Sequence, residues 1–365
     1  MPHRSLMASR FDRRRLLAAS GGLVLAAPFA SHTSVSAQDS IVATMVTDTA
    51  GIGDESFNDL AKEGGDRAVS ELGIEFNILE SQTAADYVRN LTDAAESSDI
   101  TVGVGFLLQD ALTEVAPEYP DSYFAIIDAE VDSDNVVSYL FREQEGAFLA
   151  GALAALSTKS GVIGFMGGIR IPPVMRYEVG YVSGAKSVNP DIEILISYAD
   201  DFENPTLGKE LTLAQYNNNA DIVIAAAGRS GIGAFDAAKE KGEGVFVIAA
   251  DQDQSELGAE FQLAAVIKKL DTGVYDAIKA VLEDSFEGGV HNLGISEEGM
   301  GIDNFHASVS QDIKDTISAY SAAIGDGTIV PPADDAALEA FQLVPPSEVG
   351  ASASPAASPE ASPAS

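Results

Sequence analysis

Short apolar runs alternate with amphipathic stretches along most of this 365-residue chain, and this alternation restricts its fold more than any other feature. A first series spans residues 41–140 and opens with a strand pattern at 41–46 and a helical pattern at 58–72, which Gly73 ends. A second series of the same kind spans residues 161–250. Strands that alternate with helices are typical of parallel sheets covered by helices. The sequence therefore predicts an α/β fold of two doubly wound units.

The elements after residue 250 are too few for a third unit, although they include a clear helical pattern at 273–284. We expect them to return to both units, which gives two lobes joined by several crossovers. The first lobe is expected to comprise residues 38–157 and 251–284, and the second residues 158–250 and 285–333. A ligand would lie in the cleft between the lobes, and hinge closure would be the working motion.

Both ends of the chain have compositions that set them apart from these units. Three arginines at 13–15 precede a moderately apolar run at 16–29, and small residues at 35–37 offer a cleavage site. This pattern predicts a twin-arginine-like signal peptide over residues 1–37. At the other end, residues 345–365 are mostly Ala, Ser and Pro and predict a disordered tail.

The charge and the absence of cysteine exclude several classes of function. The formal net charge is −35, and removal of residues 1–37, which hold five Arg and one Asp, would change it to −39. Such an acidic surface disfavours nucleic acid, anionic membranes and highly charged anionic ligands. A chain without cysteine has no disulfides, no thiolate catalysis, no thiolate metal site and no cysteine for a lipid anchor.

The loop at 48–58 (DTAGIGDESFN) connects the first strand pattern to the first helical pattern. In open α/β sheets ligands bind beyond the carboxyl ends of the strands, where this loop would lie. Phe57 and Asn58 are therefore candidate ligand contacts. Asp54 and Ser56 are expected to cap the helix, since short polar side chains at this position accept backbone N–H bonds.

Three further strand ends carry polar or glycine residues, at Asp128, Gly228 and Asp251. The loop that begins at Gly228 has the spacing GxxGxG, which does not match a dinucleotide fingerprint. It is either a backbone approach to a ligand or a simple tight turn. Lys268 is either a partner of a carboxylate and the ligand or a surface lysine.

The sequence lacks the usual catalytic motifs: it has no HExxH, no GxSxG and no Walker-type phosphate loop. The stretch after Asp251 fails the EF-hand pattern because Glu256 stands in place of the required glycine. We therefore expect a binding protein with no metal and no cofactor. An exported nucleoside hydrolase with a metal held by Asp48, Asp54 and Asp128 is the enzymatic alternative.

Several segments together resemble one known family and run in that family's order from about residue 41 to 332. They are 48–58, 104–112 (VGFLLQDAL), 124–128 (FAIID), 141–151 (FREQEGAFLAG), 161–168 (GVIGFMGG), 226–233 (AAGRSGIG), 248–254 (IAADQDQ) and 266–271 (VIKKLD). The chain is similar to the basic membrane protein family of ABC-transporter substrate-binding proteins, whose members include bacterial purine nucleoside receptors. This resemblance implies the type I periplasmic-binding fold, with two Rossmann-like lobes, three crossovers and a ligand in the cleft.

The resemblance also implies roles for individual residues. Nucleoside-binding members stack the base on an aromatic ring, and Phe57 stands at that place. Asp251 and Lys268 match the pair expected to hold the ribose hydroxyls. The other matching positions are Asp48, Asn58, Asp128 and Gly228, and the candidates for a second aromatic wall are Phe106, Phe202 and Phe235.

The function implied by the resemblance is that of an exported, monomeric solute-binding protein in the periplasm or at the cell surface, associated with the plasma membrane. It would bind a nucleoside, with purines favoured, and deliver it to a membrane permease. Two alternatives keep the same fold: a binder of a sugar or another small metabolite, and a ligand-sensing receptor.

Overall fold

Two six-stranded sheets organise the computed structural model, which describes residues 41–349. The strands of the first sheet, in spatial order, are β11 (Gly289–Leu293), β5 (Val136–Phe141), β4 (Tyr123–Ile127), β3 (Ile100–Val104), β1 (Val42–Val46) and β2 (Glu75–Leu79). Those of the second sheet are β12 (Met300–Asp303), β10 (Gln262–Lys268), β9 (Phe246–Ala249), β8 (Ile222–Ala226), β6 (Val162–Gly167) and β7 (Glu193–Tyr198). Neighbouring strands are parallel except for β12, which runs antiparallel to β10.

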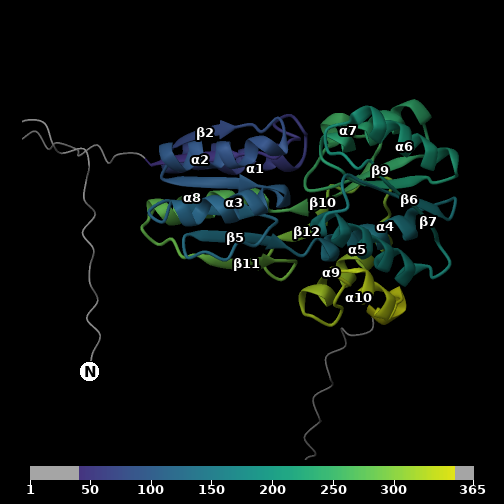
Figure 1. Ribbon diagram of the computed structural model, residues 1–365. Helices are drawn as coiled ribbons and strands as arrows, with labels where there is room; N and C mark the ends of the chain where they lie inside the picture. The colour runs from purple at the N-terminus through teal and green to yellow at the C-terminus, as the bar shows by residue number, and fades with distance from the viewer. Residues whose placement is uncertain (1–40, 350–365) are drawn as a thin grey trace, which may run out of the picture. The chain divides into compact units, whose positions relative to one another are not determined.

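Helices cover each sheet and complete two lobes (Figure 1). The first lobe has α1 (Phe57–Leu72), α2 (Tyr87–Ser97), α3 (Gln109–Val115) and α8 (Leu270–Leu282). The second has α4 (Glu143–Ser157), α5 (Pro172–Val188), α6 (Pro205–Asn217), α7 (Arg229–Lys241), α9 (Gln311–Gly325), α10 (Asp335–Ala340) and α11 (Pro346–Val349). Short 3₁₀ turns are η1 (Ala84–Asp86), η2 (Phe106–Leu108), η3 (Ala116–Glu118) and η4 (Ser255–Leu257).

The chain crosses between the sheets three times, from β5 into α4, from β10 into α8 and from β11 to β12. The alternating pattern of the sequence thus predicted the two parallel-sheet units correctly. It also predicted where α1 ends, because Gly73 has a φ of 71° and its N–H donates to the carbonyl of Val69 at 3.1 Å.

The expected lobe boundaries are wrong at three elements. β10, expected in the first lobe, pairs with β9 and β12 of the second sheet. β11, expected in the second lobe, pairs with β5 of the first sheet. α4, expected in the first lobe, packs against α5 in the second, as Figure 1 shows. A local pattern identifies a strand or a helix, but its partner depends on contacts far along the chain.

Glycine determines the packing of α4 on α5. A Cβ atom on Gly151 would lie 2.0 Å from the carbonyl oxygen of Tyr181, and one on Gly184 would lie 2.0 Å from that of Phe148. The two helices therefore touch backbone to backbone, and only glycine permits this approach. This contact assigns α4 to the second lobe.

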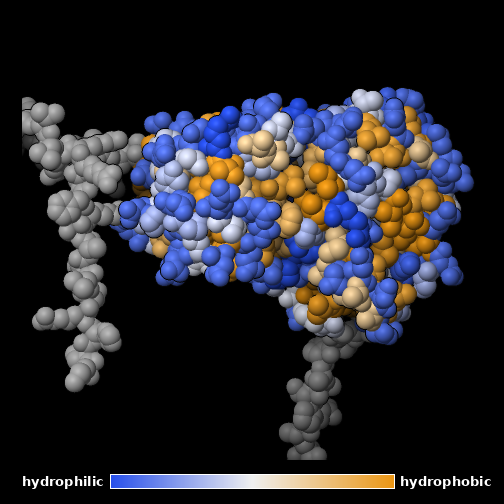
Figure 2. All heavy atoms as spheres, in the orientation of Figure 1, coloured by the Kyte–Doolittle hydropathy of each residue, from blue (hydrophilic) through white to orange (hydrophobic). Residues whose placement is uncertain are grey.

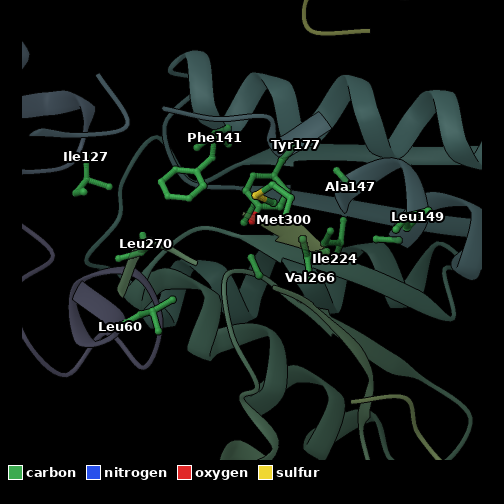
Figure 3. Packing of buried hydrophobic residues seen from close by; sticks show 14 of the residues in the cluster. Leu60, Ile127, Phe141, Ala147, Leu149, Tyr177, Ile224, Val266, Leu270 and Met300 are labelled. Atoms are coloured by element: carbon green, nitrogen blue, oxygen red, sulfur yellow. The ribbon is translucent and has the colours of Figure 1, made fainter. Parts of the chain in front are cut away.

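Buried apolar side chains form a continuous cluster under the helices, part of which Figure 3 shows. Leu60 of α1 and Leu270 of α8 belong to it, as do Ala147 of α4 and Val266 of β10. Burial of this kind stabilises by about 25 cal/mol per Å² of apolar surface. In Figure 2 hydrophilic residues cover most of the visible face of the first lobe, and apolar residues gather in patches over the second.

The expected tail begins later than predicted, because Pro346–Val349 form α11. The hydroxyl of Tyr320 on α9 donates to the carbonyl of Val344 at 2.6 Å and holds the chain there. The rest of the tail and the predicted signal peptide lie outside the described residues. Within residues 41–349, none of the helices has the length and apolar character needed to cross a membrane.

Candidate functional site

The strand ends of both lobes surround one cavity of about 570 Å³, a volume that includes its opening. Every residue predicted to contact a ligand lines it: Asp48, Phe57, Asn58, Phe106, Asp128, Gly228, Asp251 and Lys268. The structure therefore brings together side chains that lie far apart in the sequence. Parallel strands whose carboxyl ends meet at one edge account for this convergence.

The carboxylate of Asp54 caps α1. It accepts hydrogen bonds from the backbone N–H groups of Ser56 at 3.1 Å, Asn58 at 2.9 Å and Asp59 at 3.1 Å. Burial raises the pKa of Asp54 to about 7, against the lowering effect of these bonds. The capping role predicted for Asp54 is confirmed. The one predicted for Ser56 is wrong, since its hydroxyl donates instead to Asp251 Oδ2 at 3.0 Å.

The side-chain NH₂ group of Asn58 donates to two carboxylates, whereas its side-chain carbonyl oxygen has no hydrogen-bond donor among the described residues. Its Nδ2 donates to Asp48 Oδ1 at 2.8 Å and to Asp54 Oδ2 at 3.2 Å. Burial raises the pKa of Asp48 to about 6, although the bonds from Asn58 and from the N–H of Ala50 lower it. The buried Oδ1 of Asn58 has no hydrogen-bond partner among residues 41–349. The amide therefore presents an acceptor that needs a donor from outside the protein.

Lys268 is buried and lies between two carboxylates. Its Nζ contacts Asp128 Oδ2 at 2.6 Å and Glu143 Oε1 at 2.9 Å, while Arg176 Nε contacts Glu143 Oε2 at 2.6 Å. Burial opposes the charge on Lys268, but Asp128 and Glu143 together raise its pKa. Against the effect of burial, Lys268 and Arg176 lower the pKa of Glu143. Lys268 thus stays charged, and the surface-lysine alternative is wrong.

The expected partnership of Lys268 with Asp251 is not a direct one. Asp251 accepts a hydrogen bond from the hydroxyl of Tyr177 at 2.9 Å as well as the one from Ser56. The other oxygen of Asp128, Oδ1, is buried and lacks a partner in the described part of the chain. Lys268 therefore pairs with Asp128 and Glu143, and Asp251 is held by two neutral hydroxyls.

Aromatic side chains reach the cavity from both lobes. Phe57, the first residue of α1, has its ring centroid 5.2 Å from Lys268 Nζ. Phe202 follows β7 in the second lobe, and Phe106 begins η2 in the first; both line the cavity. Gly168 makes room for Phe202, because a Cβ there would lie 2.2 Å from its ring. Phe235, the remaining candidate for the second wall, is buried in the core of the second lobe.

Sequence reasoning missed Tyr177, Glu143 and Arg176. Tyr177 lines the cavity from α5, and burial raises its pKa well above the usual range, so its hydroxyl stays a donor. Arg176 and Tyr177 lie inside α5 and Glu143 begins α4, and a tyrosine or a charged residue in a helix gives no local sign that it belongs to a site. Within residues 41–349 no group of three or more His, Cys, Asp or Glu side chains is arranged to hold a metal ion.

Comparison with known proteins finds close relatives. A family model described as Bmp, ABC transporter substrate-binding protein PnrA-like, matches residues 41–334. The chain is 36% identical over 327 residues to the ABC transporter nucleoside-binding protein BmpA of Lactococcus lactis, a match that covers 83% of this chain and 92% of that protein. It is 35% identical over 319 residues to a CD4+ T-cell-stimulating antigen of Listeria monocytogenes, covering 81% and 89%.

Among solved structures, an ABC transporter solute-binding protein from Aeropyrum pernix K1 superposes with a TM-score of 0.76. Its sequence is 32% identical, and the match covers 82% of this chain and 96% of that one. The arrangement of two parallel-sheet lobes with a cavity between them is that of type I periplasmic solute-binding proteins, which confirms the expected fold.

Proposed function

The chain belongs to the Bmp family of PnrA-like ABC transporter substrate-binding proteins, and from this premise we propose that it binds a nucleoside between its lobes, with purine nucleosides preferred. It would deliver this ligand to a membrane permease as an exported monomer. The family consists of solute-binding proteins, so we propose capture and release without covalent chemistry.

The proposal rests on two buried hydrogen-bond acceptors in the cavity that have no donor among the described residues. Asn58 Oδ1 and Asp128 Oδ1 are both buried and both lack a partner among the described residues. A buried acceptor without a donor costs about 1–3 kcal/mol, which a ligand rich in N–H and O–H groups would recover. A base with amino or imino groups and a sugar with free hydroxyls has this character.

Aromatic walls support a base rather than a sugar alone. Phe57 and Phe202 come from opposite lobes and line the same cavity. A base stacked on one aromatic ring gains roughly 1–3 kcal/mol, since every base has a π-face. Closure of the lobes would bring one ring to each face of the base.

The charge of the cavity argues against phosphorylated ligands. Lys268 is the cation among the described lining residues, and Asp128 and Glu143 already neutralise it. Asp48 and Asp251 add further carboxylates to the lining. A phosphate dianion would meet repulsion here, so we propose nucleosides and not nucleotides.

Titration calorimetry with adenosine, guanosine, inosine and cytidine tests the proposal. Phe57→Ala and Asp251→Ala are each expected to weaken purine nucleoside binding at least about tenfold. Phe305→Ala, a partly buried aromatic outside the cavity lining, and Asp236→Ala on α7 serve as matched controls and should bind as the native chain does.

Other ligands and activities give distinct outcomes in the same experiments. Binding of sugars with no binding of nucleosides would replace the nucleoside by a sugar and remove the role of Phe57. Release of free base from a nucleoside by the purified protein would establish the hydrolase alternative. Equal affinity of the native chain and Phe57→Ala for every nucleoside would contradict the proposed stacking.

A further inference from the structure

The loop that connects β1 to α1 touches the second lobe at points that do not face the ligand cavity. Arg229 Nη2 donates to the carbonyl of Ile52 at 2.6 Å, and Gln254 Nε2 donates to that of Glu55 at 2.7 Å. Gln252 Nε2 donates to the carbonyl of Ser56 at 3.3 Å. We call Ile52 to Ser56 the latch loop. The three side-chain donors all come from the second lobe, at the start of α7 and in the turn after β9.

The first lobe builds the latch loop by itself. Asp59 accepts the backbone N–H of Gly53 at 2.8 Å and that of Glu55 at 2.9 Å. Glu80 accepts the N–H of Ile52 at 3.1 Å. The carboxylates of the first lobe thus accept from N–H groups of the loop, and the carbonyl of Ser56 also accepts the N–H of Leu60 at 2.9 Å. The carbonyls of Ile52 and Glu55 accept from donors of the second lobe. Such a division means that the loop keeps its form when the lobes separate.

The backbone of the loop is strained at its contact point. Glu55 has a φ of 54°, in the left-handed region that side chains other than glycine seldom adopt. Gly53, two residues earlier, has a φ of 84°, which glycine adopts freely. A conformation of this kind costs of order 1 kcal/mol or more and persists where other contacts hold it. The carbonyl of Glu55 is the group that Gln254 reaches.

We propose that Arg229, Gln252 and Gln254 are positioning residues that hold the lobes closed and thereby set the rate of ligand release. Of the described residues that line the cavity, none is one of these three, so they act without touching the ligand. The proposal rests on the proposed function in that it takes the cavity between the lobes as the ligand site. Beyond that function, it proposes that residues outside the cavity control how fast the ligand is released, separately from the residues that recognise it.

Dissociation rates separate the two roles. We expect Arg229→Ala and Gln254→Ala each to release inosine and adenosine about tenfold faster in stopped-flow displacement, and the double variant on the order of 100-fold faster. The ratio of the two dissociation constants should stay as in the native chain. Arg89→Ala and Gln311→Ala, which remove an Arg and a Gln from α2 and α9, are the controls and should not change release.

A second measurement needs no ligand. The chain has no cysteine, so Asp93→Cys on α2 and Glu243→Cys beyond α7, both exposed, give unique labelling sites on the two lobes. Single-molecule energy transfer in the ligand-free protein should show a minor closed population, which Arg229→Ala and Gln254→Ala reduce about tenfold each.

Each result decides between the two proposals. If the native chain binds no nucleoside, the proposed function fails, and the energy-transfer measurement still decides the latch. Unchanged release rates, a changed preference between inosine and adenosine, or a ligand-free protein without a closed population would overturn the latch.

Discussion

In each lobe an aspartate follows a central strand at the cavity, but the two aspartates have different partners. Asp128 follows β4 with a φ of 67°, and Asp251 follows β9 with a φ of 70°. Asp128 faces a buried ammonium group, whereas Asp251 accepts from the hydroxyls of Ser56 and Tyr177. Similar backbone geometry in both sheets therefore supports an ionic contact on one side of the cavity and neutral hydrogen bonds on the other.

The difference predicts which side stabilises the fold and which side responds to the ligand. Removing one partner of a buried ion pair is costly, since the remaining charge stays buried and unpaired. A carboxylate held by hydroxyls can exchange one of them for a hydroxyl of the ligand at low cost. Substitutions on the two sides should therefore have unequal effects on folding and on binding.

The largest effect is expected from removal of the buried cation. Lys268→Ala leaves Asp128 and Glu143 buried without their shared partner, so the free energy of unfolding should fall by about 3–5 kcal/mol. Urea unfolding followed by circular dichroism measures this change. Lys241→Ala, at an exposed lysine on α7, should alter stability by less than about 0.5 kcal/mol. A loss for Lys268→Ala as small as that control would show that the ion pairs are not required.

The pH dependence of the free energy of unfolding should reveal the raised pKa of Asp54. Because burial raises its pKa to about 7, the folded state holds this proton more tightly than the unfolded state does. Its contribution to stability is therefore full at acidic pH and is lost as the pH rises from about 4 to 7. We expect a decline on the order of 2–4 kcal/mol over this range.

Asp54→Asn keeps a capping oxygen but cannot titrate, which makes it the matched variant for this prediction. The difference in unfolding free energy between the native chain and Asp54→Asn should change with pH over the same range. A difference that is constant from pH 4 to pH 7 would show that Asp54 is already ionised at acidic pH.

A direct comparison of the two strand-end carboxylates sharpens the contrast. Asp128→Asn should lower stability by about 1.5–3 kcal/mol, since it weakens a charge-assisted bond to Lys268. Asp251→Asn should cost about 1 kcal/mol in stability and weaken nucleoside binding more than about tenfold. Chemical unfolding and calorimetry on the same preparations measure both quantities. Equal stability losses in the two variants would remove the distinction between the lobes.

The smallest effect is expected at the strained residue of the latch loop. Glu55→Gly relieves a strain of order 1–3 kcal/mol at the positive φ, and the greater freedom of glycine in the unfolded chain offsets about 0.4–1 kcal/mol of it, so the free energy of unfolding should rise by about 0.5–1 kcal/mol. Its backbone carbonyl remains available to Gln254, so nucleoside release should not accelerate. Faster release from Glu55→Gly would mean that the side chain of Glu55 contributes to closure.

Much of the site could be predicted from the sequence because buried strands, and the residues that follow them, are recognised from local patterns. Loops after buried strands meet at one edge, and this rule alone predicts that Asp128, Gly228 and Asp251 lie near one another. The stacking role proposed for Phe57 rests on the resemblance to a family, since a single aromatic residue in a loop does not by itself indicate stacking. The strand and helix patterns likewise determined most elements, and their alternation determined the two units.

What could not be predicted depends on contacts between distant segments. Glu143 and Lys268 form an ion pair although they lie 125 positions apart in the sequence. Tyr177 donates to Asp251 from a helix whose sequence pattern does not indicate this contact. β11 was missed because it is an exposed edge strand without an apolar run. The latch partners of the loop at 52–56 belong to the other lobe, which no local pattern could show.

The identity of the bound ligand tests the central claim most directly. The purified protein would be incubated with an equimolar mixture of nucleosides, nucleotides and sugars, washed, and denatured, and the released molecule identified by mass spectrometry. We expect a purine nucleoside, released at about one molecule per chain from the native protein and at much lower occupancy from Phe57→Ala. Release of a sugar or a nucleotide, or equal retention of the nucleoside by Phe57→Ala, would contradict the account.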